Sequence, residues 1–145
     1  MAEKKSTPIK SGSKISKTSL PKTKKKVGVA ISEQGRVYIA ATFNNTMVTV
    51  TNSKGDTIAW GSSGSSGFKG TRKSTPYAAT IAVENAVKKA AEKGLKTVEV
   101  YIKGPGGGRD SALRAIRTGG LSISLISDIT PIPHNGPRPK KKRRI

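Results

Sequence analysis

Two glycine-rich segments with several cations stand directly before runs that read as helices. Residues 61–73 contain four glycines, and residues 104–109 contain four more. A helix start presents unpaired backbone N–H groups and the positive end of the helix dipole to an anion, and glycine lets a phosphate approach the backbone. The sequence therefore predicts phosphate binding at both loops. The candidate residues are Lys69, Arg72, Lys73, Lys103, Gly106, Gly107, Gly108, Arg109, Arg114 and Arg117.

Other interpretations of these loops stay open. A nucleotide site is disfavoured, because the second loop lacks the Gly-Lys-Ser/Thr end of a P-loop and its glycines miss the dinucleotide-binding spacing. Glycines that serve only tight turns remain an alternative. Phe68, in the first loop, either stacks on a base or anchors its own loop.

The C-terminal segment predicts a polyanionic partner. Residues 131–145 hold six cations, four prolines and no acid. Such a segment buries almost no apolar surface, so we expect it to take a single shape only on RNA or DNA. The candidate contacts in this segment are His134, Asn135, Arg138, Lys140, Lys141, Lys142, Arg143 and Arg144.

Charge divides the chain into three parts. The formal net charge is +20, from 28 Lys and Arg against 8 Asp and Glu. Residues 1–26 hold nine Lys and one Glu, and residues 27–130 are only mildly basic. This distribution predicts a disordered basic tail over residues 1–26, a folded core over 27–130 and a basic, proline-rich tail over 131–145.

Composition also excludes several classes of protein. The chain has no cysteine, which excludes disulfides and thiolate metal sites. No apolar run approaches the ~18 residues of a membrane span, and the N-terminus has no apolar signal core. An organelle transit peptide is disfavoured, because no Arg precedes Arg36 and the segment has no amphipathic period. We expect a cytoplasmic protein that does not contact a membrane, binds no cofactor and does not form a homo-oligomer.

The first half of the core reads as an antiparallel meander. β-branched residues between Val27 and Trp60 are dense, and Gln34-Gly35 and residues 53–56 read as hairpin turns, with a third turn at Asn44-Asn45. Val37, Ile39, Ala41 and Phe43 are expected on one face of their strand, and Trp60 is expected in the core. The expected strands are residues 27–31, 37–43, 47–51 and 57–60.

The second half alternates helices and strands. A helix is expected from a cap at Ser74 or Thr75 to Gly94, and a shorter one over residues 110–118 with a cap at Asp110 or Ser111. Strands are expected at 97–102 and 121–129, the last with Ile123, Leu125 and Ser127 on one side. Helical crossovers favour parallel pairing, so the sequence predicts an α/β fold with a mixed sheet and two helices.

Catalysis is poorly supported by the sequence. His134 is the single histidine and has no partner in its tail, and the core acids are scattered. A metal-dependent nuclease needs several carboxylates that converge on its ions. Asp128, at a strand end, is the one acid without a helix-face, cap or turn explanation. We therefore expect no enzyme and no metal site.

The dipeptide Asn135-Gly136 is both a turn signal and a chemical liability. Glycine leaves the next backbone nitrogen free to attack the Asn side chain, and the resulting succinimide reopens largely to isoaspartate. Two alternatives stay open: an ordinary Asn in a turn, or isoaspartate at a tight kink between Pro133 and Pro137.

Four motifs closely resemble the small-subunit ribosomal protein eleven family in its bacterial form. They are Phe43-Asn44-Asn45-Thr46, the run from Gly67 to Ala79, Lys103-Gly104-Pro105-Gly106-Gly107-Gly108-Arg109, and the run from Asp128 to Gly136 with the basic end. The resemblance covers about residues 27–145, and residues 1–26 fall outside it.

The resemblance implies a core like that of ribonuclease H without its active site. It also implies binding to small-subunit, 16S-type rRNA on the platform, near the mRNA exit path and next to other platform proteins. Asn44 and Asn45, in the first matching motif, join the candidate RNA-binding residues. The alternative that charge leaves open is a DNA-binding architectural protein.

Overall fold

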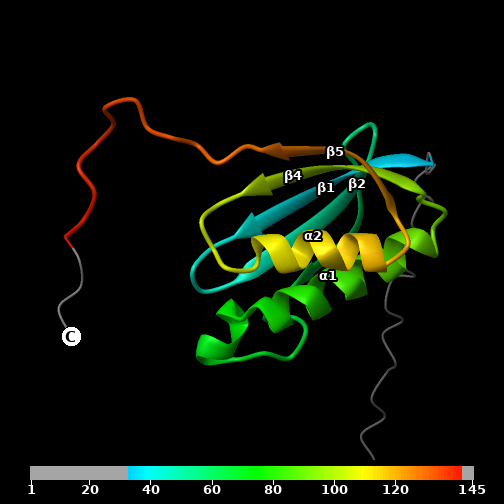
Figure 1. Cartoon of the computed structure of the whole chain (residues 1–145), viewed down its shortest axis with the longest axis horizontal. Helices are drawn as coiled ribbons and strands as arrows, with labels where there is room; N and C mark the ends of the chain where they lie inside the picture. Colours follow the sequence, from blue (N-terminus) through cyan, green and yellow to red (C-terminus); the bar gives the residue numbers. More distant parts are fainter. Residues whose placement is uncertain (1–32, 142–145) are drawn as a thin grey trace, which may run out of the picture.

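The computed structural model describes residues 33–141, which form one sheet, two α-helices and one short 3-10 helix (Figure 1). The strand expected at residues 27–31 lies outside the described residues. The elements are β1 (Gln34–Ala41), β2 (Thr46–Asn52), β3 (Thr57–Ser62), η1 (Gly70–Ser74), α1 (Pro76–Ala91), β4 (Thr97–Lys103), α2 (Arg109–Thr118) and β5 (Ser122–Asp128).

The five strands lie in the order β3-β2-β1-β4-β5. β2 pairs antiparallel with both β1 and β3, whereas β4 pairs parallel with β1 and β5. The predicted mixed sheet, with parallel pairing where helices connect strands, is therefore confirmed. No helix within residues 33–141 is long and apolar enough to cross a membrane.

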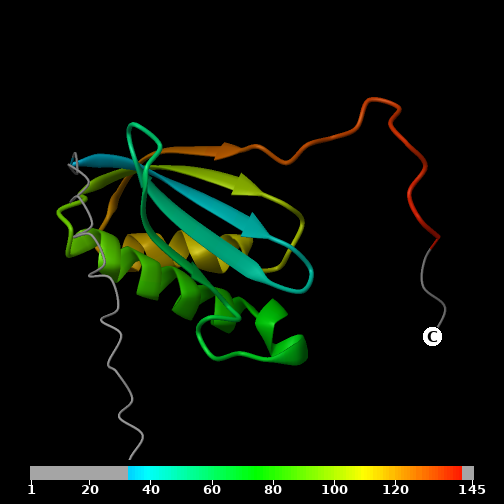
Figure 2. The same cartoon turned by 180° about the vertical axis from the view of Figure 1, so that it is seen from behind.

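Both α-helices cover the same face of the sheet, and the other face is left uncovered (Figures 1 and 2). The hydrophobic core lies between the sheet and the two helices. Val83 and Val87 of α1 and Ile116 of α2 are fully buried there against the strands. α1 begins where its sequence predicts, because the Thr75 hydroxyl accepts a hydrogen bond of 3.2 Å from the Ala78 N–H.

The hairpin turn expected at Gln34-Gly35 is wrong, because both residues belong to β1. A Cβ on Gly35 would lie 2.4 Å from the Thr51 carbonyl oxygen and 2.7 Å from a Leu95 methyl carbon. The glycine is thus a packing requirement inside a strand, where the backbone approaches its neighbours closely. The turn expected at residues 53–56 is confirmed, with Asp56 N–H donating to the Asn52 side chain over 2.9 Å.

Phe43, expected within a strand, lies beyond its end, and Trp60, expected in the core, is exposed. β1 ends at Ala41, and a tight turn in which Thr42 N–H donates to the Asn45 carbonyl leaves Phe43 73% exposed. Trp60 is 62% exposed because it pairs with Thr49, which in turn pairs with Tyr38 on the uncovered face of the sheet. Alternation along a strand cannot reveal where the strand ends or whether one face stays uncovered.

A β-bulge in β5 overturns the expected facing of its side chains. Val98 pairs with Ile123 but Glu99 pairs with Leu125, so Ser124 is the extra residue. Its hydroxyl donates to the Val98 carbonyl over 3.2 Å. After the bulge Leu125 faces the uncovered side with Glu99, and Ile123 shares the helix-covered side with Ile126 instead.

Two smaller expectations about helix starts are also wrong. The N-cap of α2 is Gly108, so Asp110 lies in the first turn, and the Ser111 hydroxyl donates to the Gly108 carbonyl instead of capping the helix. Residues 70–74, expected as loop, form η1.

Candidate nucleic-acid interface

The predicted phosphate-binding loops lie at one end of the molecule. Because β1, β4 and β5 are parallel, their carboxyl ends share one edge of the sheet, and the turn after β1 and the loop after β4 lie side by side there (Figures 1 and 2). α1 and α2 both begin at this edge, where Pro76 and Gly107 line one groove. We call this region the loop end, and it comprises residues 42–45, 64–75, 103–108 and 129–131.

Close packing explains three of the four glycines in the second loop. A Cβ added to Gly104, Gly106 or Gly108 would lie 2.3 Å from an oxygen atom of the protein. These oxygens are the Ala41 carbonyl, the Thr42 carbonyl and the Thr46 hydroxyl, respectively. A Cβ at Gly107 would meet nothing within 4 Å, and Gly107 is exposed. The loop therefore combines a structural role for three glycines with one free position at the start of α2.

Arg109 ties the second loop to the start of the C-terminal tail. Its guanidinium donates to the Gly104 carbonyl, to the Asp128 carboxylate and, over 3.3 Å, to the Thr130 hydroxyl. Gly104 N–H also donates to that hydroxyl, over 3.0 Å. The side chain is 29% exposed. Arg109, predicted as a phosphate contact, is thus engaged within the protein, and we name this network the Arg109 junction.

Asp128 is explained by the same junction. The Thr130 hydroxyl and the Thr130 backbone N–H donate to one carboxylate oxygen over 2.6 and 2.9 Å, and Arg109 binds the other. These three interactions, in that order, lower the pKa of Asp128 to about 2. No group of three His, Cys, Asp or Glu that could hold a metal occurs among residues 33–141.

The first loop is compact, and two of its three cations are exposed. Phe68 meets Tyr77 of α1 edge to face, with ring centroids 5.9 Å apart, so the anchoring interpretation of Phe68 is supported. The Ser62 carbonyl accepts from the hydroxyls of Ser65 and Ser66. Lys69 and Arg72 are exposed and Lys73 is half-buried.

The turn at residues 42–45 adds amide groups to the loop end. Asn45 N–H donates to the Thr42 hydroxyl over 3.1 Å, which leaves Asn44 and Phe43 exposed at the tip. Within the described residues the buried side-chain oxygen of Asn45 has no hydrogen-bond partner. A buried acceptor of this kind is a candidate for a donor supplied by a ligand.

The C-terminal tail leaves the body at the loop end (Figure 1). His134, Arg138, Lys140 and Lys141 are exposed, and residues 131–141 contain no helix or strand. Asn135 has φ 60° and is the one non-glycine residue in residues 33–141 with a positive φ. The predicted kink is therefore present. Lys142, Arg143 and Arg144 lie outside the described residues.

The two predicted cations of α2 differ in their distance from the loop end, because Arg114 also lines the groove beside Pro76 and Gly107. Arg117 is in the last turn of α2, and Arg114 and Arg117 line a groove between α2 and β5. The structure thus places Lys69, Arg72, Lys73 and Lys103 at the same end as the tail, with Arg114 beside the helix starts, but it places Arg117 along the side of the domain.

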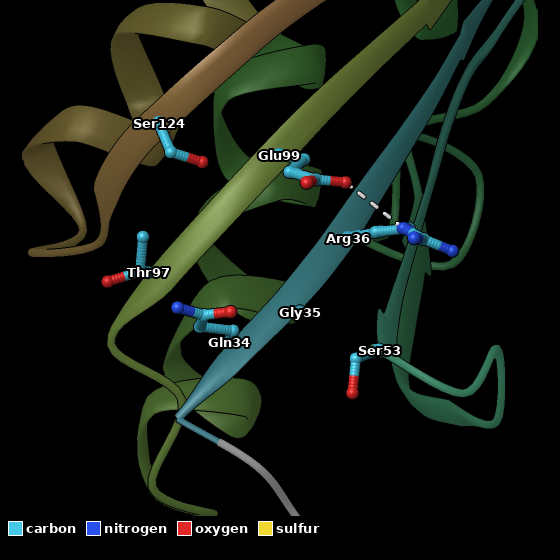
Figure 3. A pocket seen from close by; sticks show the side chains of 7 residues that line it. All are labelled: Gln34, Gly35, Arg36, Ser53, Thr97, Glu99 and Ser124. Carbon is cyan, nitrogen blue, oxygen red and sulfur yellow. Dashed lines mark hydrogen bonds and ion pairs between the residues drawn. The ribbon is translucent and has the colours of Figure 1, made fainter.

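Sequence reasoning did not point to a hollow on the uncovered face, near the start of β1 and β4 (Figure 3). Arg36 and Glu99 point toward each other across it, with 3.1 Å between Nε and Oε2, and Tyr101 also donates to Glu99. The ion pair raises the pKa of Arg36, and the hydrogen bond to Glu99 raises the pKa of Tyr101. Because Glu99 neutralises Arg36, this hollow is a weaker phosphate site than the loop end.

A comparison with known families matches residues 35–144 to the family described as Ribosomal protein S11. The chain belongs to this family. The match spans nearly all of the described core and of the tail, and it confirms the resemblance that the four motifs indicate. Members of the ribosomal protein S11 family are small-subunit ribosomal proteins.

We predict that Asp128 titrates with a pKa of about 2, measured from its carboxyl chemical shift during an NMR pH titration. Because the pKa is lowered on folding, this carboxylate stabilises the folded protein above its unfolded pKa, and the contribution is lost as the pH falls toward about 2. Thr130→Val should raise the pKa more than Arg109→Ala. A larger effect of Arg109→Ala would contradict the assigned causes.

Gly107 and Gly108 make a matched pair for testing the second loop. We expect Gly108→Ala to lower the free energy of unfolding by about 1–3 kcal/mol through overpacking against Thr46. Gly107→Ala should leave stability unchanged but weaken rRNA binding, because its Cβ would stand between the helix start and a phosphate. Denaturant unfolding and filter binding measure the two effects. Unweakened binding by Gly107→Ala would mean that no phosphate approaches there.

Proposed function

We propose that the protein binds small-subunit rRNA through the loop end and the C-terminal tail, as a structural and non-catalytic component. The observation that carries this proposal is convergence: four predicted cations, two helix starts and the tail lie at one end of the domain. The four cations are Lys69, Arg72, Lys73 and Lys103.

Charge elsewhere on the domain supports this assignment. Seven acidic residues lie among the described residues, and five of them lie away from the loop end. These five are on strands, on α1 or near turns at the opposite end of the domain, and they include Glu33, Asp56 and Glu92. Glu33 pairs with Lys96 over 2.7 Å. Of the two acids near the loop end, Asp128 is neutralised by Arg109. A phosphate backbone therefore meets net positive potential at the loop end.

The loop end and the tail have different roles in this proposal. The loop end is held rigidly by the Arg109 junction and by close packing of glycines, so it can fix the orientation of the domain on folded RNA. The tail has no packing of its own in residues 131–141 and supplies charge that neutralises neighbouring phosphates.

The proposed location is the platform of the small subunit, near the mRNA exit path and the rRNA 3′ end. There the protein would contact other platform proteins, support subunit assembly and act in translation in the cytoplasm. This proposal extends the family assignment to the site that the loops and tail define.

The direct test is co-sedimentation with small ribosomal subunits at high salt, followed by a competition between folded rRNA and duplex DNA at equal salt. We expect the protein to stay with the subunit and to prefer the rRNA. Equal affinity for duplex DNA would favour the DNA-binding architectural alternative.

Binding to rRNA should depend steeply on salt. If ~10 phosphates are neutralised, the slope of log K against log salt is about −7 to −9. Deletion of residues 137–145 should make this slope shallower and weaken binding to most RNAs alike. The measurement is filter binding over a salt series, and an unchanged slope would show that the tail does not lie on phosphate.

We further propose that some or all of Asn135 is converted to isoaspartate. The positive φ of Asn135 supports this, and a Cβ on Gly136 would lie 3.2 Å from the Pro133 Cβ, which shows how tight the kink is. Peptide mapping of freshly prepared ribosomes with an isoaspartate methyltransferase should label the Asn135 peptide. A fully unmodified peptide would refute the modification and leave the RNA-binding proposal intact.

A further inference from the structure

The two edges of the sheet, β3 and β5, differ in how their backbone is protected. An edge strand presents unpaired N–H and C=O groups that can pair with another chain, and proteins commonly block such edges with charges, bulges or covering loops. β3 and β5 each have one neighbour in the sheet, β2 and β4 respectively.

The β3 edge is blocked by side chains of the same domain. The Lys93 ammonium group donates to the Ile58 carbonyl over 2.5 Å. The Ser65 hydroxyl accepts from Ser62 N–H over 2.9 Å, and the Ser66 hydroxyl donates to the Ser62 carbonyl over 3.0 Å. These side-chain hydrogen bonds occupy the backbone at both ends of the strand.

Within residues 33–141 the β5 edge has no such side-chain hydrogen bonds, and its one interruption is the bulge at Ser124, beyond which residues 125–127 continue the strand. No side chain in that range hydrogen-bonds to the backbone of residues 122–127, and this stretch carries no charge and no proline. Leu125 is 48% exposed on the uncovered face and Ile126 is 51% exposed on the helix-covered face. Apolar side chains are thus exposed on both faces of an open edge strand. This is the arrangement expected where a further strand pairs with the sheet.

A groove runs beside this edge on the helix-covered side. Its apolar floor is formed by Leu113 of α2 and by Ile123 and Ile126 of β5. Arg114 and Arg117 line the same groove, together with one acid, Asp110. The groove therefore combines an aliphatic floor with an excess of positive charge.

We propose that an extended segment of a neighbouring protein pairs with the outer edge of β5 and completes the sheet. On the side that meets the groove, this segment carries an aliphatic side chain against Ile126 and a carboxylate against Arg114 or Arg117. Backbone pairing supplies affinity, and the charge and shape of the groove supply specificity. The inference rests on the proposed place of the protein among other ribosomal proteins and names the surface and the chemistry of one such contact.

Other occupants fit this edge less well. Two copies of the chain paired through β5 would bring their arginine-lined helices side by side, and each chain carries a net charge of +20. The chain's own residues 1–26 hold nine Lys and one Glu, so they share the sign of Arg114 and Arg117, and residues 27–32 contain no carboxylate that could meet these arginines. RNA has no backbone amides that could extend a sheet, and none of the residues that line this groove is aromatic.

The test uses a photo-reactive benzophenone amino acid in place of Leu125, in the full chain assembled into small subunits. We expect irradiation to join it to a protein, at a peptide that contains both aliphatic and acidic residues. Adding Ile126→Lys places a third cation at the groove and should lower the yield about tenfold, whereas the matched change Thr57→Lys on the β3 edge should not. Ile126 is half exposed, so the variant should fold and still bind rRNA.

The possible results separate this inference from the proposed function. A cross-link to rRNA alone, the absence of a protein product, or a protein yield that does not respond to Ile126→Lys would overturn the inference while co-sedimentation stays normal. If neither the labelled chain nor the unlabelled chain co-sediments with small subunits, the proposed function and the proposed protein partner are both refuted.

Discussion

Parallel pairing of β4 with β1 and of β5 with β4 is the constraint on which the site depends. Parallel strands must be joined by crossovers, so each return of the chain places another loop at the same edge of the sheet. Here those loops contain glycines and cations, and α1 and α2 begin beside them. An antiparallel arrangement of the same elements would divide the loops between both ends and would disperse the positive charge.

Rigidity at this end comes from polar contacts as much as from the apolar core. Thr130 illustrates this, because its single hydroxyl donates to Asp128 and accepts from Gly104 N–H and Arg109. The Arg109 junction thereby joins the end of β5 to the loop before α2 and fixes the point from which the tail departs. An arginine whose sequence context suggests phosphate binding instead orients the groups around it.

The sequence predicts the α/β class, the two helices and the parallel strands because their apolar periods are long and regular. It fails where a local signal has more than one physical cause. Gly35 reads as a turn, but the space that Leu95 occupies requires a glycine there. The bulge at Ser124 reverses the facing of Leu125, and no alternation pattern contains that information. For the site, the sequence identifies the cations, but only the fold separates Lys69 and Lys103 at the loop end from Arg117 beside β5.

The central claim is that the position of charge, rather than its amount, determines rRNA binding. Two triple variants test it: Lys69, Arg72 and Lys73 to Ala at the loop end, and Lys54, Lys88 and Lys89 to Ala elsewhere on the domain. Both remove three positive charges. The loop-end variant should lose more than about tenfold in rRNA affinity, since one hydrogen bond to a charged group contributes about 1.5 kcal/mol or more, and the other should lose much less. Equal losses would show that binding is diffuse electrostatic attraction and would contradict the account.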